Sequence, residues 1–418
     1  MFRPIIAIRF IPVLLATLLF SCASNTHLGT MDWSRSYTQK GNPPGFRSAV
    51  YHINDSISSA VISFPSSGIT LLKQVKGSVA SRRLRISVSV FNSIQDKRIM
   101  DSTSCLISDT TVIADHILRH SFTLRAYSGS DYLLKTEVTD LGNGEKYQLL
   151  YPFQKSSTAN PAWFGFENNK GELITDNRVS GNEEVRVFAQ NLKIGSLRCL
   201  AFNMSFPAAI PPFINKERPL FKYRYDSSFT VRLESGKSKN LQFRRTGFYL
   251  FQPDTSKVDG ITLFRFYDGF PKVNSPQRML EALRYITTSK EYEKLLANPY
   301  PKEAVDSFWV ATAGGPDRAV ELIRNYYSKV EEANRYFSSF CEGWKTDRGM
   351  IYIALGPPNV VYRSDQNEEW VYGEANNYHS IRFLFVKAIN PFTQNDYVLQ
   401  RQYTYKDVWY NAIQQWRR

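Results

Sequence analysis

Apolar and polar residues alternate along the early part of the chain in the two-residue rhythm of half-buried β-strands. The clearest runs are 84–91, 121–127 and 132–138, and turn signals such as that at 142–144 separate them. Because successive side chains of a strand point to opposite faces, the alternation predicts one buried and one solvated face. Short strands at regular spacing predict an immunoglobulin-like β-sandwich over residues 46–155.

The same rhythm returns in a second stretch. Strands are predicted at 186–189, 229–233, 247–251 and 261–267, all rich in β-branched and aromatic residues. We expect a second, smaller β-rich domain over residues 156–272.

The hydrophobic period changes from two to nearly four after Ser275. Ser275, followed by proline, is typical of a helix N-terminus, and Thr288 with Glu291 forms a capping-box pattern. A third helix is predicted at 302–312. The longest helix is predicted at 316–340, where apolar residues recur every three or four positions.

Strands are predicted again at 350–355, 368–372, 380–386 and 397–403, before a terminal helix at 406–416. Helices beside a meander of strands make an α+β module, expected over residues 273–418. The predicted fold class is therefore multidomain. N-terminal all-β, immunoglobulin-like sandwiches precede a C-terminal α+β module with a long helix and an antiparallel meander.

The N-terminus has the pattern of a secretory signal peptide over residues 1–21. Arg3 and Arg9 supply positive charge, and an apolar stretch from 10 to 20 leads to Cys22. The segment resembles the bacterial lipoprotein type, in which this cysteine is acylated and becomes the first mature residue. An ordinary signal peptide followed by a chance cysteine is the alternative.

Residues 22–45 are polar and contain glycine and proline, so a flexible tether is expected there. An aspartate directly after the acylated cysteine would favour the inner membrane, but the first acidic residue is Asp32. The resemblance to lipoproteins therefore implies a lipid anchor in the outer membrane and a protein that faces the periplasm.

The composition is that of an ordinary globular protein. Hydrophobic residues make up 43% of the 418 residues and charged residues 22%, which excludes a disordered chain. The formal charge of +14 falls to +12 when the signal peptide, with its two arginines, is removed. The excess is dispersed in short pairs, and export argues against a nucleic-acid partner. An anionic envelope polymer or lipid is a candidate partner, beside the simpler interpretation of a solvated surface.

Besides Cys22, the mature chain contains three cysteines, Cys105, Cys199 and Cys341. They form either one disulfide and one free thiol or three buried thiols. Since no two have CxxC spacing, neither zinc nor thioredoxin-like chemistry is indicated.

The stretch Gly343-Trp344-Lys345-Thr346-Asp347-Arg348-Gly349 carries the most specific motif, and Gly356-Pro357 follows it. It resembles the signature of the GWxTD-domain family of bacterial envelope proteins, and the resemblance extends over about 275–418. The matching signature residues are Gly343, Trp344, Thr346, Asp347, Gly349, Gly356 and Pro357.

The residues of the motif favour a structural connector. Thr346 and Asp347 can accept hydrogen bonds from nearby backbone N–H groups, and Gly343 and Gly349 allow unusual backbone angles. Trp344 is expected to cover the end of the long helix. The alternative makes Lys345, Asp347 and Arg348 a charged ligand or catalytic site.

Motifs of the common hydrolases and nucleotide-binding enzymes are missing from the sequence. Asp115, His116 and His120 form the one cluster of potential metal ligands, and a solvated strand face is the simpler interpretation because a third fixed ligand is not evident. We therefore expect no catalytic residue, no metal and no cofactor.

These observations predict a non-enzymatic, outer-membrane-anchored lipoprotein that acts as a scaffold or accessory subunit of an envelope assembly or secretion complex. The aromatic C-terminus, with Tyr410 and Trp416, is the candidate interface. The alternatives are a periplasmic hydrolase with a carboxylate pair that no motif reveals, and a glycan-binding protein.

Overall fold

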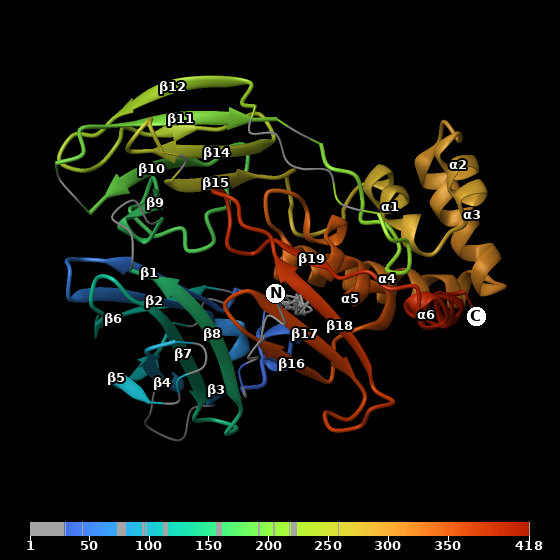
Figure 1. Ribbon diagram of the computed structural model, residues 1–418, viewed down its shortest axis with the longest axis horizontal. Helices are drawn as coiled ribbons and strands as arrows, with labels where there is room; N and C mark the ends of the chain where they lie inside the picture. Colours follow the sequence, from blue (N-terminus) through green and yellow to red (C-terminus); the bar gives the residue numbers. More distant parts are fainter. Residues whose placement is uncertain are drawn as a thin grey trace, which may run out of the picture.

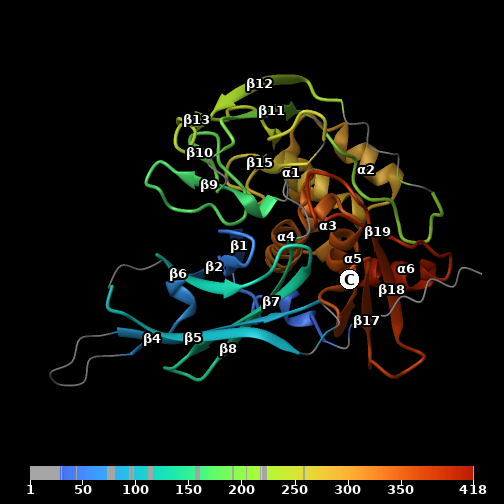
Figure 2. The same cartoon turned by 60° about the vertical axis from the view of Figure 1, so that its left-hand side comes forward.

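The computed structural model describes residues 29, 31–43, 45–72, 81–93, 96, 98–111, 116–155, 161–190, 193–203, 205–216, 218, 224–257 and 259–417. The predicted signal peptide, Cys22 and Asp115 lie outside these residues. Figures 1 and 2 show two β-rich modules, one above the other, with the C-terminal module beside both. Among the described residues, no helix is long and apolar enough to cross a membrane.

The first β-rich module is built from two antiparallel sheets around one core. One sheet has the order β1 (Arg47–His52), β2 (Ile57–Pro65) and β6 (Ile117–Arg125). The other joins β3 (Leu71–Leu72), β4 (Ser81–Phe91), β7 (Asp131–Asp140) and β8 (Lys146–Gln154), with β5 (Ile99–Asp109) on the other edge of β4. Alternate β4 residues point into the core against the first sheet, among them Leu84, Ile86 and Val88.

The second β-rich module repeats this arrangement with shorter strands. One sheet contains β9 (Phe164–Asn168), β10 (Glu184–Ala189) and β13 (Leu241–Gln242). The facing sheet has the order β12 (Ser227–Arg232), β11 (Ser196–Phe202), β14 (Gly247–Gln252) and β15 (Ile261–Arg265). Phe166, Val187, Leu197 and Phe251 from the two sheets share one buried core. The predicted β-rich N-terminal region is confirmed.

The C-terminal module begins with four helices, α1 (Pro276–Ala282), α2 (Ser289–Leu296), α3 (Pro301–Ala313) and α4 (Pro316–Phe337). Ser275 caps α1, and Thr288 and Glu291 form the predicted capping box at the start of α2. Gly314 ends α3 in the left-handed conformation, with φ of 73°. These helix predictions are confirmed.

The strand predicted at 350–355 is wrong, because this segment is the helix α5 (Asp347–Leu355). The apolar residues of this segment are buried on every side of the helix, so the sequence shows neither the two-residue period of a strand nor the 3.6-residue period of a helix. Without such a period, a short buried strand cannot be distinguished from a buried helix by pattern. Thr346 supplies the helix N-cap. Gly356 and Pro357 therefore follow a helix instead of a strand.

An antiparallel meander follows α5, in the order β16 (Val360–Arg363), β17 (Asn367–Tyr372), β18 (Ile381–Lys387) and β19 (Tyr397–Leu399). The terminal helix α6 (Tyr405–Trp416) closes the module. The helices and meander confirm the predicted C-terminal fold class, although β16 was not predicted and β19 is shorter than expected.

The flexible tether predicted over 22–45 is wrong for residues 31–43. The short helix η1 (Ser34–Tyr37) lies in this segment, and Trp33 and Tyr37 are 1% and 6% exposed within the C-terminal core. The Trp33 N–H donates to the Val361 carbonyl (2.9 Å), so the segment runs along the edge strand β16. Burial of the Trp33 and Tyr37 side chains contributes enough free energy to offset the conformational entropy that this polar segment loses when it is ordered.

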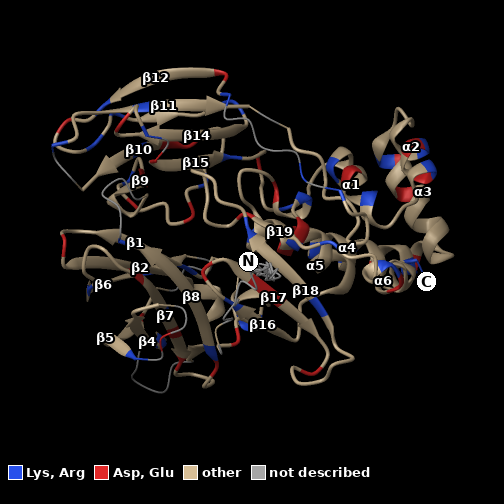
Figure 3. Cartoon of the chain, in the orientation of Figure 1, with Lys and Arg blue, Asp and Glu red and all other residues tan. Residues whose placement is uncertain are grey.

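Apolar contacts join the three modules. Ala49, Tyr51 and Val61 of the first sandwich pack against Phe188 of the second. Phe202 and Phe248 of the second pack against Phe340 and Phe392 of the C-terminal module. Figure 3 shows Lys and Arg interspersed with Asp and Glu on all three modules, as the dispersed charge of the sequence predicts.

Candidate functional site

The signature motif forms a tight turn against the backbone of α4. The single 3-10 turn η5 (Gly343–Lys345) connects α4 to α5. A Cβ atom on Gly343 would overlap the carbonyl oxygen of Ala333, and one on Gly349 would overlap the carbonyl oxygen of Gly343. Neither residue has a positive φ. The expectation of unusual backbone angles is therefore wrong for both, and close backbone approach is what requires glycine.

Side chains at the end of α4 hold this turn in place. Asn334 Oδ1 accepts the Trp344 N–H (3.1 Å), and Ser338 Oγ accepts the Gly343 N–H (2.9 Å). Both side chains are buried, so each satisfies a backbone donor that water cannot reach.

The remaining signature residues also serve the fold. Thr346 Oγ1 accepts the Gly349 N–H (3.1 Å) as the cap of α5 and donates to the Gly343 carbonyl (2.7 Å). The Trp344 carbonyl accepts the Tyr285 hydroxyl (2.8 Å), and the indole packs edge-on against that ring. Thr346 thus forms the predicted bond to a nearby backbone N–H group.

Asp347 reaches beyond its own helix. Its carboxylate accepts the Leu399 N–H (2.8 Å) at the end of β19 and pairs with both terminal nitrogens of Arg401. Arg401 also donates to the carbonyl of Ile210 (3.2 Å), in the connection between β11 and β12 of the second sandwich. Asp347 therefore ties α5 to the meander and, through Arg401, to an earlier module.

Arg348 and Glu368 form a second ion pair (3.2 Å), with side chains 1% and 0% exposed. Glu368 also accepts hydrogen bonds from the Tyr37 hydroxyl (2.9 Å) and the Trp370 indole (2.7 Å). Burial opposes ionisation of Glu368, but Arg348 and Arg363 outweigh it and hold the pKa of the carboxyl below its usual value. Glu368 is therefore an ionised carboxylate whose charge is held by two arginines.

The three charged residues of the alternative site do not converge. Lys345 pairs with Glu342 (3.0 Å), whereas Asp347 and Arg348 bind Arg401 and Glu368. Each charge is balanced by a different partner, which favours the structural interpretation of the motif.

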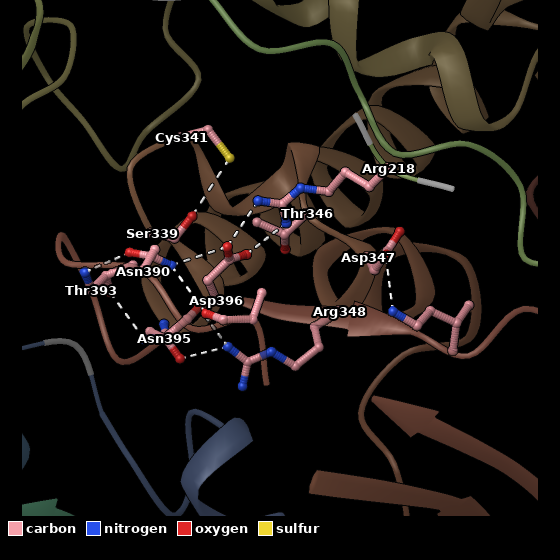
Figure 4. Close-up of polar contacts among 12 residues, drawn as sticks. Arg218, Ser339, Cys341, Thr346, Asp347, Arg348, Asn390, Thr393, Asn395 and Asp396 are labelled. Carbon is pink, nitrogen blue, oxygen red and sulfur yellow. Dashed lines mark hydrogen bonds and ion pairs between the residues drawn. The ribbon is translucent and has the colours of Figure 1, made fainter. Parts of the chain in front are cut away.

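The loop between β18 and β19 completes this network (Figure 4). Arg348 donates to the Asn395 carbonyl (3.0 Å), and Asn395 Nδ2 donates to the carbonyls of Tyr336 and Ser338 at the end of α4 (both 3.0 Å). The neighbouring Asp396 accepts two bonds of 2.8 Å from Arg218.

Cys341 lies beside this network, with its Sγ 3.7 Å from Ser339 Oγ (Figure 4). Burial raises the pKa of the thiol to about 12, so it stays protonated near neutral pH and is a poor nucleophile. Cys105, Cys199 and Cys341 are all free thiols. The sequence left open one disulfide with a free thiol or three buried thiols. The structure has three thiols, and Cys199 is the one that is fully buried.

Of the three potential metal ligands noted in the sequence, Asp115 lies outside the described residues, and His116 and His120 have different neighbours. His116 Nε2 lies 3.0 Å from Asp109, which also pairs with Arg82 (3.4 Å), whereas the His120 ring packs edge-on against Phe122. Within the described part of the chain, no group of three His, Cys, Asp or Glu residues could hold a metal ion.

The two candidate interface residues have different surroundings. Tyr410 is 48% exposed, with its ring 5.5 Å from that of Phe213. Trp416 is half-buried, and its indole donates to the carbonyls of Ile353 and Ala354 at the end of α5 (3.1 and 3.2 Å). Tyr410 thus faces solvent, while Trp416 completes the fold.

A cleft of about 470 Å³ lies where the three modules meet. Aromatic, amide and charged side chains line it, and these include Tyr51, Tyr151, Tyr397, Gln154, Asn177, Gln394, Lys387, Arg363, Asp131 and Asp365. Burial lowers the pKa of Lys387. Sequence reasoning missed this cleft because its residues come from segments far apart in the chain.

Comparisons with known proteins identify the C-terminal part of the chain. A search of curated proteins found no match. Residues 247–418 match the model of the GWxTD domain. The matched segment begins with β14 of the second sandwich and includes the signature turn, α5 and the meander. This part of the chain is therefore a GWxTD domain, as the motif at 343–349 suggested.

Proposed function

We propose that this chain is a non-enzymatic lipoprotein, anchored in the outer membrane and facing the periplasm, which serves as a scaffold or accessory subunit of an envelope assembly or secretion complex. The anchor is supported by the sequence pattern that ends at Cys22. The scaffold role is supported by one surface, which the GWxTD domain forms together with the connection between β11 and β12.

That surface, here the aromatic surface, consists of Tyr403, Tyr410, Phe213 and Lys406. Tyr403 is 71% exposed, and its hydroxyl lies 3.2 Å from Lys406 Nζ. Lys406 precedes Tyr410 by one turn of α6. Tyrosine supplies a large apolar contact area with a polar tip at low conformational cost, which is why it is enriched at the centres of protein interfaces. The aromatic surface is the observation that carries the proposal.

The apolar contacts between modules give this surface a fixed position. The buried aromatic residues at 33 and 37 and the mixed cores at the module junctions hold the C-terminal module against both sandwiches. A partner that docks on α6 would therefore be held at a defined place relative to the rest of the chain, as a scaffold requires.

A photo-crosslinking amino acid at position 410 tests the proposal in intact cells. We expect a discrete crosslink to an envelope protein from position 410. The matched control is position 127, where Tyr127 is 52% exposed on the first sandwich. Absence of a crosslink at 410, or the same products from both positions, would contradict docking at the aromatic surface.

The junction cleft favours glycan binding as a second candidate function. Aromatic rings beside amide side chains are suited to the apolar faces and hydroxyls of sugars. Binding of soluble cell-wall glycan fragments, weakened at least tenfold by Tyr151→Ala but unchanged by Tyr127→Ala, would support it. Equal binding by both variants would argue against this candidate.

A further inference from the structure

Three arginines, one from each module, converge near the junction. Arg178 of the second sandwich lies over the Phe270 ring, 5.3 Å from its centroid. Asn334, the residue before Arg335 in the last turn of α4, donates to the carbonyl of Pro271, which follows Phe270 (3.1 Å). The segment that carries Phe270 is thus bound to the end of α4, and Arg178 lies within electrostatic range of both Arg335 and Arg47.

The third arginine approaches from the first sandwich. Tyr336, the residue after Arg335, donates from its hydroxyl to the Asn42 carbonyl (3.5 Å). A turn closed by the Phe46 N–H and the Pro43 carbonyl (3.0 Å) leads directly to Arg47, the first residue of β1. Arg47 lies within electrostatic range of Arg335 and Tyr336 at the end of α4, so the three arginines belong to one charged cluster.

The positive charge of this cluster is only partly balanced, because Asp176 is the one carboxylate of the described chain that acts on Arg47 and Arg178. Among the described residues, no carboxylate lies within 4.0 Å of Arg47, Arg178 or Arg335. Burial, together with the charges of Arg47 and Arg335, lowers the pKa of Arg178 to about 10, although Asp176 opposes this effect. Arginine is otherwise charged at all ordinary pH values.

One guanidinium nitrogen of the cluster lacks a partner. Arg335 Nη1 is buried and makes no hydrogen bond. The two acidic residues before it on α4 are engaged elsewhere, since Glu331 accepts the Val273 N–H (3.0 Å) and Glu332 binds Lys329 (2.9 Å) and Tyr352 (2.6 Å). A buried donor of this kind calls for a partner.

We propose that Arg47, Arg178 and Arg335 form a binding site for a phosphate-type oxyanion. The planar guanidinium fork donates two parallel hydrogen bonds to such an anion, and three forks can neutralise one phosphate group. Because each arginine belongs to a different module, the bound anion would also draw the three modules together. The phosphate belongs either to a small soluble molecule or to a lipid headgroup, and both present the same chemistry.

Thermal unfolding of the purified protein in sodium phosphate, against sodium chloride of equal ionic strength, tests the site. Inorganic phosphate is expected to raise the Tm of the parent protein. Arg335→Gln and Arg178→Gln should each weaken phosphate binding at least tenfold and lose that rise, while their Tm in chloride stays equal or increases because repulsion is relieved. Arg232→Gln, which removes an exposed arginine on β12, is the matched control and should keep the full response.

A second arm uses vesicles that contain phosphatidylglycerol. Vesicle binding that Arg335→Gln abolishes, without a response to inorganic phosphate, would assign the site to a lipid headgroup. The proposal is overturned if the parent protein responds to neither probe, or if Arg335→Gln and Arg232→Gln respond alike to both.

Discussion

Arg348 and Glu368 pair at 3.2 Å in a site that solvent scarcely reaches, on a helix and a strand that lie 20 residues apart in the chain. A buried pair of this kind gains little over an apolar replacement, because both charges must first be removed from water. Loss of one partner is different, since it leaves the other charge buried and uncompensated. The pair therefore makes the packing of α5 on the meander dependent on both residues at once.

Arg348→Met should destabilise the protein by about 3–5 kcal/mol. The double variant Arg348→Met/Glu368→Leu should lose clearly less than the sum of the two single variants, because no charge remains unpaired. Urea unfolding of the four proteins measures this coupling. Additive losses would show that the two residues act independently.

Tyr37→Phe should cost about 1.5–3 kcal/mol, because it removes a hydrogen bond to the ionised Glu368 carboxylate. Tyr285→Phe removes a bond to a neutral acceptor, the Trp344 carbonyl, and should cost only about 0.5–1.5 kcal/mol. Urea unfolding compares the two variants. An equal loss in both would contradict a special role for the N-terminal segment in satisfying Glu368.

Gly343→Ala should destabilise the GWxTD domain by about 1–3 kcal/mol, because the added methyl group meets the α4 backbone at Ala333. Gly195→Ala is the matched control, since no atom lies within 4 Å of the corresponding Cβ position. Thermal unfolding distinguishes the two. If both variants melt alike, close backbone approach does not explain the signature glycine.

The sequence predicts those elements whose signals are local. The capping box of Thr288 and Glu291 and the alternation along β7 need only neighbouring residues, and both were predicted correctly. The assignment of 350–355 failed because burial on all sides removes the period that distinguishes helix from strand.

The buried network of the candidate site is not local. Tyr37 lies 331 residues from Glu368, and no pattern in either segment points to the other. The one available signal was Glu368 itself, which lies two residues before Trp370 and therefore on the same face of the predicted strand. It indicates that a partner must exist without identifying it.

Arg417 controls the ionisation of Glu291 at the capping box of α2. Hydrogen bonds from Arg417 are the main cause that lowers the pKa of Glu291 from 4.5 to about 2. Because the folded pKa is the lower one, this contact stabilises the fold above pH 4.5 and is lost as the pH falls toward 2. Arg417→Gln should raise the pKa of Glu291 in an NMR titration, whereas Lys290→Gln, which removes a similar charge from the same helix, should leave it nearly unchanged.

Cys22→Ser tests the proposed anchor. The substitution should abolish incorporation of labelled fatty acid and move the protein from the membrane to the soluble periplasmic fraction, because it removes the acyl chains that hold it. Cys105→Ser is the matched control and should remain in the membrane fraction. Release of both variants, or of neither, would contradict a lipid anchor at Cys22.

The same anchor would place the GWxTD domain close to the membrane. Gly29, whose N–H donates to the Arg363 carbonyl of β16 (2.9 Å), follows Cys22 by seven residues, and a fully extended chain of that length spans at most about 25 Å. Insertion of 30 Gly/Ser residues after Ser24 should therefore make β16 and its neighbours accessible to a membrane-excluded crosslinker, while the protein stays in the membrane fraction. Equal accessibility before and after insertion would show that the domain is already held away from the lipid surface.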